Sequence, residues 1–367
     1  MRRERIALTA LILVLVLSAA GIYVARQGIA NGATRTDYVS FDTSFVLTLS
    51  SDVFPLEREA NEVVWVSEQG TFFTHGGDKG RGRGYTESDS GIYKYAPGSN
   101  PAKVADLPKP LHHIGFAYSP DTGLVYTYAG GTSFKGGGTQ IYWFNPADNT
   151  TGTCAETYPY NSVTVSAVYS TVQKKTYLFG GFNSSHIYRE MWKHDPIAHT
   201  VTKIGNVEVG TACIFQVIVY VEPEDAIYLL GGMDVSGKSV TEICRFDCAA
   251  EKMTLLDEVC PDNKTKGMGA YYDSDVGVIV LAGGRNGNPW TGYTTRMWVF
   301  SPSDCSTRVL SCTLPGFCDD LAGGFDTVTN KGYFMRVTPE GYAGYSKNDP
   351  CAYGDNQKYI CEVSHRE

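Results

Sequence analysis

The sequence has few runs of strong helix formers. Stretches of Ala, Leu, Glu and Lys are scarce, whereas 40 Gly, 24 Tyr and abundant Val and Thr favour strands and tight turns. Of the 367 residues, 43% are hydrophobic and 19% are charged, which is ordinary for a folded globular protein and excludes a disordered chain. The composition therefore predicts an all-β fold.

The chain also lacks an excess of basic residues. Its formal net charge is −8, and removing residues 1–20 takes away three Arg and one Glu and leaves −10. Nucleic acid is bound through Lys and Arg that neutralise its phosphates, so a chain this acidic is a poor partner for it. We therefore expect no nucleic-acid partner.

No C-x-x-C motif occurs among the ten cysteines, all of which lie beyond residue 150. A zinc site is therefore not expected, and no metal or other cofactor is predicted. The even number suits an oxidising compartment and makes disulfides the default interpretation. Their pairing stays open, although Cys244 and Cys248 on one extended strand would lie about 13 Å apart, beyond the reach of a disulfide.

Catalytic motifs are missing too, since neither G-x-S-x-G nor H-E-x-x-H occurs. His112 and His113 are adjacent, as are Asp319 and Asp320, and neighbouring residues on an extended chain point in opposite directions. Neither pair is expected to serve one reaction centre, and the histidines are interpreted as surface and packing residues. No catalytic residue is predicted, and the balance leans away from an enzyme.

The N-terminus carries a long apolar run. Residues 1–5 read MRRER, and nineteen uncharged residues follow, IALTALILVLVLSAAGIYV. This pattern is typical of a secretory signal peptide or an uncleaved signal-anchor helix in residues 1–24, and both alternatives stay open. The basic lead stays in the cytoplasm, so the rest is expected outside it, either secreted or anchored as a single-pass membrane protein. Residues 25–36 are then a linker, and residues 37–367 are the folded domain.

Glycine pairs recur along the folded domain, each at the end of an apolar run. The five pairs are Gly76-Gly77, Gly130-Gly131, Gly180-Gly181, Gly231-Gly232 and Gly283-Gly284, at intervals of 54, 50, 51 and 52 residues. Each unit has another apolar run before the pair and two more after it, which predicts a four-stranded antiparallel sheet. A period near fifty is typical of radial repeats, in which each sheet covers its neighbour.

A downstream aromatic position repeats with the pairs. Tyr93, Tyr142, Trp192 and Trp298 each stand four residues before a proline, while the fourth unit has Cys244 and Cys248 instead. Together with the glycine pairs, this arrangement resembles the kelch family of β-propellers over roughly residues 38–367. Galactose oxidase shares this propeller, but no set in this chain matches its copper ligands.

The repeat predicts six blades. Residues 320–327 and 330–338 fall at the right interval for the first two strands of the last blade, although the glycine pair is lost at Val337-Thr338. Residues 38–49 resemble third and fourth strands and are expected to complete that sheet and close the ring. The tail, residues 341–364, also contains strand-like pieces and competes for this place, so a seventh, partial blade is the alternative.

One segment has a competing interpretation as a nucleotide site. GGMDVSGKS, from Gly231 to Ser239, contains the G-x-x-x-x-G-K-[ST] pattern of a phosphate-binding loop. Such a loop needs a helix after it, and sibling units carry proline inside the corresponding segment, at Pro97, Pro146, Pro196 and Pro302. The segment is therefore predicted to be strand and turn, and the match to be accidental.

The loops after the glycine pairs are the longest and most varied, and the kelch resemblance implies a ligand surface there. Each holds a cation, and together they carry +4 on a body near −10. The candidate ligand-binding residues are Arg81, Arg83, Lys135, Arg189, Lys238, Arg285, Trp290, Tyr293 and Arg296. They favour an anionic ligand, with the aromatic side chains as stacking surfaces, and the alternative is that they are solvated loop charges.

Two functions stay open. The preferred hypothesis is a secreted or membrane-anchored propeller that binds a protein or an acidic glycan through its blade loops. The alternative is a small extracytoplasmic enzyme that acts on carbohydrate in the axial pocket. Asn149, Asn183 and Asn263 lie in N-x-[ST] and are acceptor sites if the host attaches glycans.

Overall fold

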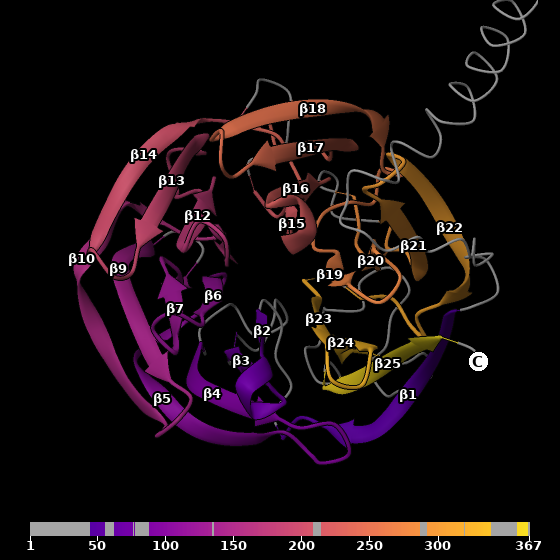
Figure 1. Ribbon diagram of the computed structural model, residues 1–367, viewed down its shortest axis with the longest axis horizontal. Coiled ribbons are helices and arrows are strands. Elements are labelled where there is room, and N and C mark those ends of the chain that lie inside the picture. Colours follow the sequence, from indigo (N-terminus) through magenta and orange to yellow (C-terminus); the bar gives the residue numbers. More distant parts are fainter. Residues whose placement is uncertain are drawn as a thin grey trace, which may run out of the picture. The chain divides into compact units, whose positions relative to one another are not determined.

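The protein is an all-β propeller of six four-stranded antiparallel blades arranged in a ring (Figure 1). The computed structural model describes residues 45–55, 62–75, 77, 88–133, 136–207, 214–286, 292–318, 320–338 and 358–365. Residues 41–367 form one compact unit. The predicted signal or anchor segment and linker lie outside the described residues, among which no helix is long and apolar enough to cross a membrane.

The first three blades follow chain order from the ring centre outward. Blade 1 contains β2 (Val63–Val66), β3 (Thr71–His75), β4 (Asp89–Tyr95) and β5 (Ala102–Leu111), with the 3-10 turn η1 (Ser67–Gln69) between β2 and β3. Blade 2 contains β6 (Gly115–Ser119), β7 (Leu124–Tyr128), β9 (Gly136–Asn145) and β10 (Thr150–Ser162), with the short β8 (Gly131–Ser133) paired to β9. Blade 3 contains β11 (Ser166–Ser170), β12 (Lys175–Phe179), β13 (Glu190–Asp195) and β14 (Thr200–Asn206).

Blades 4 and 5 repeat this order, whereas blade 6 joins the two ends of the folded unit. Blade 4 contains β15 (Val217–Val221), β16 (Ala226–Leu230), β17 (Glu242–Asp247) and β18 (Lys252–Val259), with η3 (Glu222–Glu224) after β15. Blade 5 contains β19 (Gly269–Asp273), β20 (Val278–Ala282), β21 (Arg296–Ser301) and β22 (Ser306–Thr313). Blade 6 contains β23 (Ala322–Asp326), β24 (Lys331–Val337), β25 (Tyr359–His365) and β1 (Phe45–Val53).

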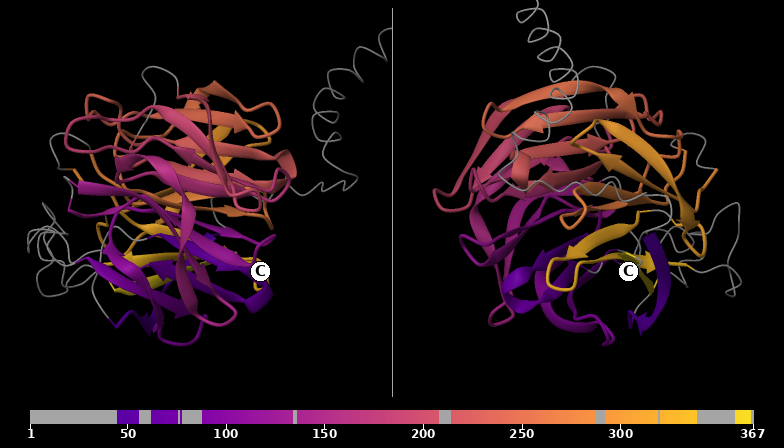
Figure 2. Two further views of the ribbon diagram at one scale, coloured as in Figure 1. Left: turned by 90° about the vertical axis from the view of Figure 1, so that its left-hand side faces the viewer. Right: turned by 45° about the vertical axis from the view of Figure 1, so that its right-hand side comes forward.

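The ring closes in blade 6, where β1 pairs antiparallel with β25. These strands come from opposite ends of the chain and lie side by side in Figures 1 and 2. The predicted competition between the N-terminal strands and the tail is resolved by sharing, because the tail supplies the third strand and residues 45–53 supply the fourth. The described strands therefore make six blades, and the alternative of a seventh is not needed to place any of them.

Neighbouring blades bury their apolar faces against each other, as the repeat predicts. A buried apolar cluster fills each of the six junctions. An aromatic pair with ring centroids 5.1–5.4 Å apart spans each junction as well: Phe73–Phe144, Tyr126–His194, Tyr177–Phe246, Tyr228–Phe300, Tyr271–Phe334 and Phe72–Tyr333. Burial of these faces is the main force that stabilises the ring.

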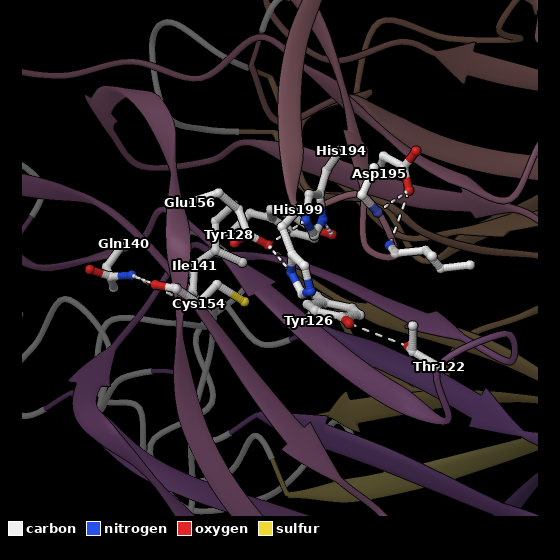
Figure 3. A network of polar contacts seen from close by, with 12 residues as sticks. Thr122, Tyr126, Tyr128, Gln140, Ile141, Cys154, Glu156, His194, Asp195 and His199 are labelled. Atoms are coloured by element: carbon white, nitrogen blue, oxygen red, sulfur yellow. Dashed lines mark hydrogen bonds and ion pairs between the residues drawn. The ribbon is translucent and has the colours of Figure 1, made fainter.

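The junction between blades 2 and 3 differs because a histidine provides one of the rings (Figure 3). His194, which is fully buried, bonds the Tyr128 hydroxyl through Nδ1 at 2.8 Å and Glu156 Oε1 through Nε2 at 3.0 Å. Glu156 Oε1 also lies 3.3 Å from Nδ1 of His199. Burial lowers the pKa of His194, so the imidazole is neutral at neutral pH and serves as a polar link between blades.

The repeated positions coincide in the structure, with one shift. Gly180, Gly231 and Gly283 follow their second strands directly and have positive φ, but Ala129 takes this place in blade 2 with φ 56°. The glycine pair of blade 2 is thus one residue late, which accounts for the uneven intervals of 54 and 50. In blade 6 the place belongs to Arg336, at φ 70°, whose guanidinium lies 3.8 Å from the Phe54 ring centroid.

The aromatic position on the third strand is also retained. Tyr93, Tyr142, Trp192 and Trp298 occupy equivalent register positions in β4, β9, β13 and β21. Cys244 of β17 has the same register in blade 4, and Cys361 of β25 has it in blade 6. Both cysteines are buried, so a small apolar side chain replaces the ring in these two blades.

The segment that resembles a phosphate-binding loop is a turn followed by a strand. The Asp234 carboxylate accepts hydrogen bonds from the backbone N–H groups of Ser236 and Lys238, and β17 begins at Glu242. No helix follows, so the amides have no helix N-terminus to act with. The prediction that the match is accidental is confirmed at the level of the fold.

Candidate functional site

Two sets of loops meet at one end of the ring, which we name the loop face. Each first strand begins there and each second strand ends there, because the two are antiparallel. Isolated bridges tie the third residue before a first strand to the third residue after a second strand: His112–Gly131, Val163–Phe182, Ile214–Met233 and Lys266–Arg285. The described parts of the loops predicted to bind a ligand therefore lie at the axial end at which the first strands begin.

A cavity of about 70 Å³ opens at this axial end. Its wall is built from equivalent positions two residues before successive first strands, His113, Thr164, Phe215, Gly267 and Asp320, together with their neighbours and Glu62. The contributing residues come from all six blades, so the cavity lies on the axis. Its size matches a few water-sized groups, since one water occupies about 30 Å³ in the liquid.

Four of these wall positions hold a non-glycine residue in the left-handed region. The φ angles are 50° for His113, 56° for Thr164, 53° for Phe215 and 49° for Asp320, whereas blade 5 uses Gly267. A β-branched or bulky residue at positive φ costs on the order of 1 kcal/mol or more, and glycine avoids this cost. The wall side chains are therefore kept in spite of backbone strain, as is common at binding sites.

Two wall side chains have polar atoms that are buried without a hydrogen-bond partner in the described residues. They are Oγ1 of Thr164 and both amide atoms of Gln216. Thr164 is 7% exposed and Gln216 is 6% exposed. A buried polar group without a partner costs about 1–3 kcal/mol, and both residues line the cavity.

A charged cluster stands beside these polar groups. Asp320 Oδ1 lies 3.2 Å from Nζ of Lys266, and Asp320 Oδ2 lies 3.6 Å from Nε2 of His113. The Lys266 side chain is fully buried, and its Nζ lies 4.0 Å from the centroid of the Phe215 ring. Burial disfavours the charged form of Asp320, but the neighbouring Lys266, His113 and Arg285 hold the pKa of Asp320 well below its ordinary range.

Glu62, directly before β2, faces the same cavity and has the opposite tendency. Its side chain is exposed where it lines the cavity, which opens at the axial end. Desolvation by the protein atoms around the cavity, together with the neighbouring charge of Asp320, raises the pKa of Glu62 to about 8. The pKa values of the two carboxyl groups are thus shifted in opposite directions.

Of the sequence interpretation of His112 and His113 as surface and packing residues, the surface part is wrong and the packing part agrees with their burial. His112 is fully buried and His113 is 7% exposed, and their Nδ1 atoms contact each other. The expectation that adjacent side chains point in opposite directions fails here, because His113 has φ 50° rather than an extended backbone. The two rings are therefore turned toward each other. Burial, and then the neighbouring His113, lower the pKa of His112, so this pair is not doubly charged at neutral pH.

The predicted loop residues have different surroundings. Arg81, Arg83, Lys135 and Trp290 lie outside the described residues. Arg285 is 1% exposed, and its guanidinium lies 5.6 Å from the ring centroid of Tyr293, which is also buried. Arg296 is exposed and bonds Asp262 at 2.9 Å, while Lys238 is exposed on the turn of blade 4. Arg285 thus belongs to the wall behind the axial cavity rather than to the exposed rim.

Arg189 lines a second, open depression of about 720 Å³ on the loop face. The loop that connects the second and third strands of blade 3 lines this groove, together with Asn206 of β14 and the exposed Val235 of blade 4. The guanidinium of Arg189 donates to the carbonyl oxygen of Val207, which fixes it at the edge of the groove. The structure therefore brings Arg285 and Tyr293 together but leaves Arg189 at a separate place on the rim.

The structure also describes most of the cysteines and the asparagines of the N-x-[ST] motifs. The eight described cysteines form no disulfide, and no group of three or more metal-binding side chains exists among the described residues. Asn149 and Asn263 are exposed. The Asn183 amide nitrogen donates to Tyr188 and to the carbonyl of Asn161, bonds that a glycan on this nitrogen would disturb.

The sequence interpretation missed Glu62, Thr164, Gln216 and Lys266 as parts of one site. A signal was available, because each stands within three residues of the start of a predicted first strand. These residues lie in the short connections before the first strands, whereas the predicted ligand-binding residues lie in the longer loops after the glycine pairs. Their convergence follows only from the circular arrangement of the blades.

Comparison with known proteins supports the fold class. No protein-family model matches the sequence, and no curated protein does, so the kelch relationship stays a resemblance. The chain is similar to the solved structure of YjhT, with a TM-score of 0.64 and 13% sequence identity, over 86% of this chain and 99% of that chain. Identity this low speaks for the shared propeller fold alone.

Proposed function

We propose that this propeller is an exported or membrane-anchored binding module that recognises a glycan at the axial cavity of its loop face. The observation that carries the proposal is the set of buried polar atoms at Thr164 and Gln216 that have no partner among the described residues and belong to side chains lining the cavity. Hydroxyl groups of a sugar donate and accept hydrogen bonds at close range, which is what an amide and a hydroxyl require.

The surroundings of the cavity support the same proposal. The strained wall positions fix the side chains of His113, Thr164 and Phe215 before a ligand arrives, which lowers the entropy cost of binding. The Asp320 carboxylate, which lies 3.2 Å from the Lys266 ammonium, lines the cavity and can accept a hydrogen bond from a ligand hydroxyl. Arg296 at the start of β21 and Lys238 on the turn of blade 4 are exposed on the same face.

The experiment screens the exported part of the chain, residues 37–367, on a glycan array and measures the affinity of each hit by calorimetry. Gln216→Leu is expected to weaken binding about 10-fold, the equivalent of one lost hydrogen bond. The thermal midpoint should stay the same or rise, because a buried amide without a protein partner is removed.

Gln69→Leu is the matched control, since Gln69 lies on η1 at the other end of blade 1 and should leave affinity unchanged. Equal binding by wild type and Gln216→Leu would contradict an axial site. A loss caused by Arg296→Glu but not by Gln216→Leu would place the ligand on the rim instead.

A further inference from the structure

Two carboxyl groups from distant parts of the sequence face the axial cavity. Glu62 stands at the start of blade 1 and Asp320 at the start of blade 6, which are neighbours in the ring. The sequence gives Asp320 only Asp319 as a nearby acidic partner, and adjacent residues seldom serve one centre. Closure of the ring brings Glu62, which is distant in the sequence, to the same cavity as Asp320.

The surroundings of the two groups differ. Asp320 lies 3.2 Å from the Lys266 ammonium and 3.6 Å from a ring nitrogen of His113, and both neighbours favour a carboxylate. Glu62 lines the same cavity, where desolvation by the surrounding protein atoms, and then the Asp320 carboxylate, favour the protonated acid in Glu62. Two carboxyls whose environments separate their protonation states provide an acid and a base in one site.

We propose that Glu62 and Asp320 are a catalytic acid and base that hydrolyse a glycosidic bond placed in the axial cavity, an inference that rests on the glycan site proposed above. The cavity has room for a linkage oxygen and a water molecule rather than for a whole oligosaccharide. The function is then that of an enzyme whose reaction centre lies at the base of the glycan site.

The step balances with water as the second reactant. Glu62 gives its proton to the linkage oxygen, and the bond from that oxygen to the anomeric carbon breaks with its electron pair left on the oxygen. The water oxygen bonds to the anomeric carbon, and Asp320 accepts the proton that this water loses. The proton on Asp320 returns to Glu62 through solvent, which restores both groups.

The test uses variants that keep the shape of the site. Glu62→Gln is expected to bind the glycan hit within about 3-fold of wild type but to lower kcat about 100-fold or more, in the range of general acid catalysis. The matched control, Glu68→Gln, changes an exposed glutamate on η1 and should leave both quantities unchanged.

A substrate with a highly acidic leaving group separates a catalytic role from a structural one. A dinitrophenyl glycoside needs little protonation of its leaving group, so Glu62→Gln should hydrolyse it at nearly the wild-type rate, while Asp320→Asn should be slow with both substrates. A structural defect would slow Glu62→Gln on both alike and would overturn the assignment of Glu62.

The pH profile gives a further readout. Asp320 and His113 line the cavity with Glu62, and His75 is joined to Glu62 by a backbone hydrogen bond; Lys266 and Arg285 act on Asp320, and His112 lies beside His113 and His75. An acid that must be protonated loses activity as pH rises through its pKa, here about 8, and this limb should be absent in Glu62→Gln with the dinitrophenyl glycoside.

The outcomes separate the two proposals. Saturable glycan binding that needs Gln216, with no product from wild type, would overturn the acid–base assignment and leave the glycan site intact. Absence of binding to any glycan would overturn the proposed function itself. If Asp320→Asn fails to fold, the double variant Asp320→Asn with Lys266→Met removes both buried charges, and activity retained in it would contradict the role of Asp320.

Discussion

Single residues at the axial end combine strain, burial and charge. Thr164 and Phe215 keep positive φ angles that glycine adopts at lower cost, and Lys266 is a fully buried cation beside the Asp320 carboxylate. Buried charges are expensive unless an opposite charge and hydrogen bonds accompany them. The same ring would be more stable with glycine and apolar side chains at these positions. Binding sites commonly keep residues that function requires at a cost in stability.

Replacing Asp320 with Asn should destabilise the fold by about 3 kcal/mol, because it takes the carboxylate away from the buried Lys266 ammonium. Denaturant unfolding at pH 7 measures this difference. Asp304→Asn, an exposed control, should cost less than about 0.5 kcal/mol. A cost as small as that for Asp320→Asn would contradict a stabilising ion pair.

The pH dependence of this difference has a definite sign. The pKa of Asp320 is lowered in the folded state, so the stability it provides is fully present above its ordinary value of 3.8 and is lost as pH falls below that value. Wild type and Asp320→Asn should therefore approach each other in stability only in strong acid. A difference that disappears between pH 6 and 8 would contradict this assignment.

At the scale of elements, the closing strand β1 has the largest effect. It covers the outer edge of β25, and the Phe45 ring of β1 contacts the His365 ring of β25 in a tilted arrangement with ring centroids 4.6 Å apart. Pairing the first strand of the folded unit with the last one removes an open sheet edge and links the two ends of the ring.

A chain that begins at Phe54 lacks β1 and is expected to aggregate or to unfold at a much lower temperature, because the edge of β25 is left without a partner. A chain that begins at Phe41 retains β1 and should melt within about 2 °C of the chain that begins at residue 37. Thermal melting and size-exclusion chromatography compare the three. A monomeric, equally stable chain from Phe54 would show that β1 does not close the ring.

At the scale of the whole molecule, export is still a prediction from the sequence. Residues 1–24 have the basic lead and the apolar length of a signal peptide or an anchor, and they lie outside the described residues. An exported location is consistent with a glycan ligand, and it would place the ten cysteines in an oxidising compartment.

Cell fractionation and N-terminal sequencing test this location. A mature chain that starts near residue 21 and is found outside the cytoplasm indicates a cleaved signal, whereas an intact N-terminus in the membrane fraction indicates an anchor. The double substitution Leu13→Arg and Leu15→Arg interrupts the apolar run and should keep the protein in the cytoplasm. Cytoplasmic wild-type protein would contradict both alternatives.

The repeat in the sequence determined the fold. The period near fifty, the glycine pairs and the aromatic position defined four-stranded sheets that cannot bury their faces alone, and the structure confirms six of them in a ring. These features are local, because strand alternation, turn glycines and proline positions act over a few residues. The accidental nature of the match at Gly231–Ser239 could be predicted for the same reason.

Only the tertiary structure decided the site. Glu62 and Asp320 are far apart in the chain, and the burial of Arg285 and the mutual contact of His112 and His113 depend on backbone turns that no local pattern indicates. Circular packing brings the starts of six inner strands to one point, so residues separated by several blades share a cavity. A sequence pattern reports which residues each blade contains, but proximity on the axis is a property of the closed ring.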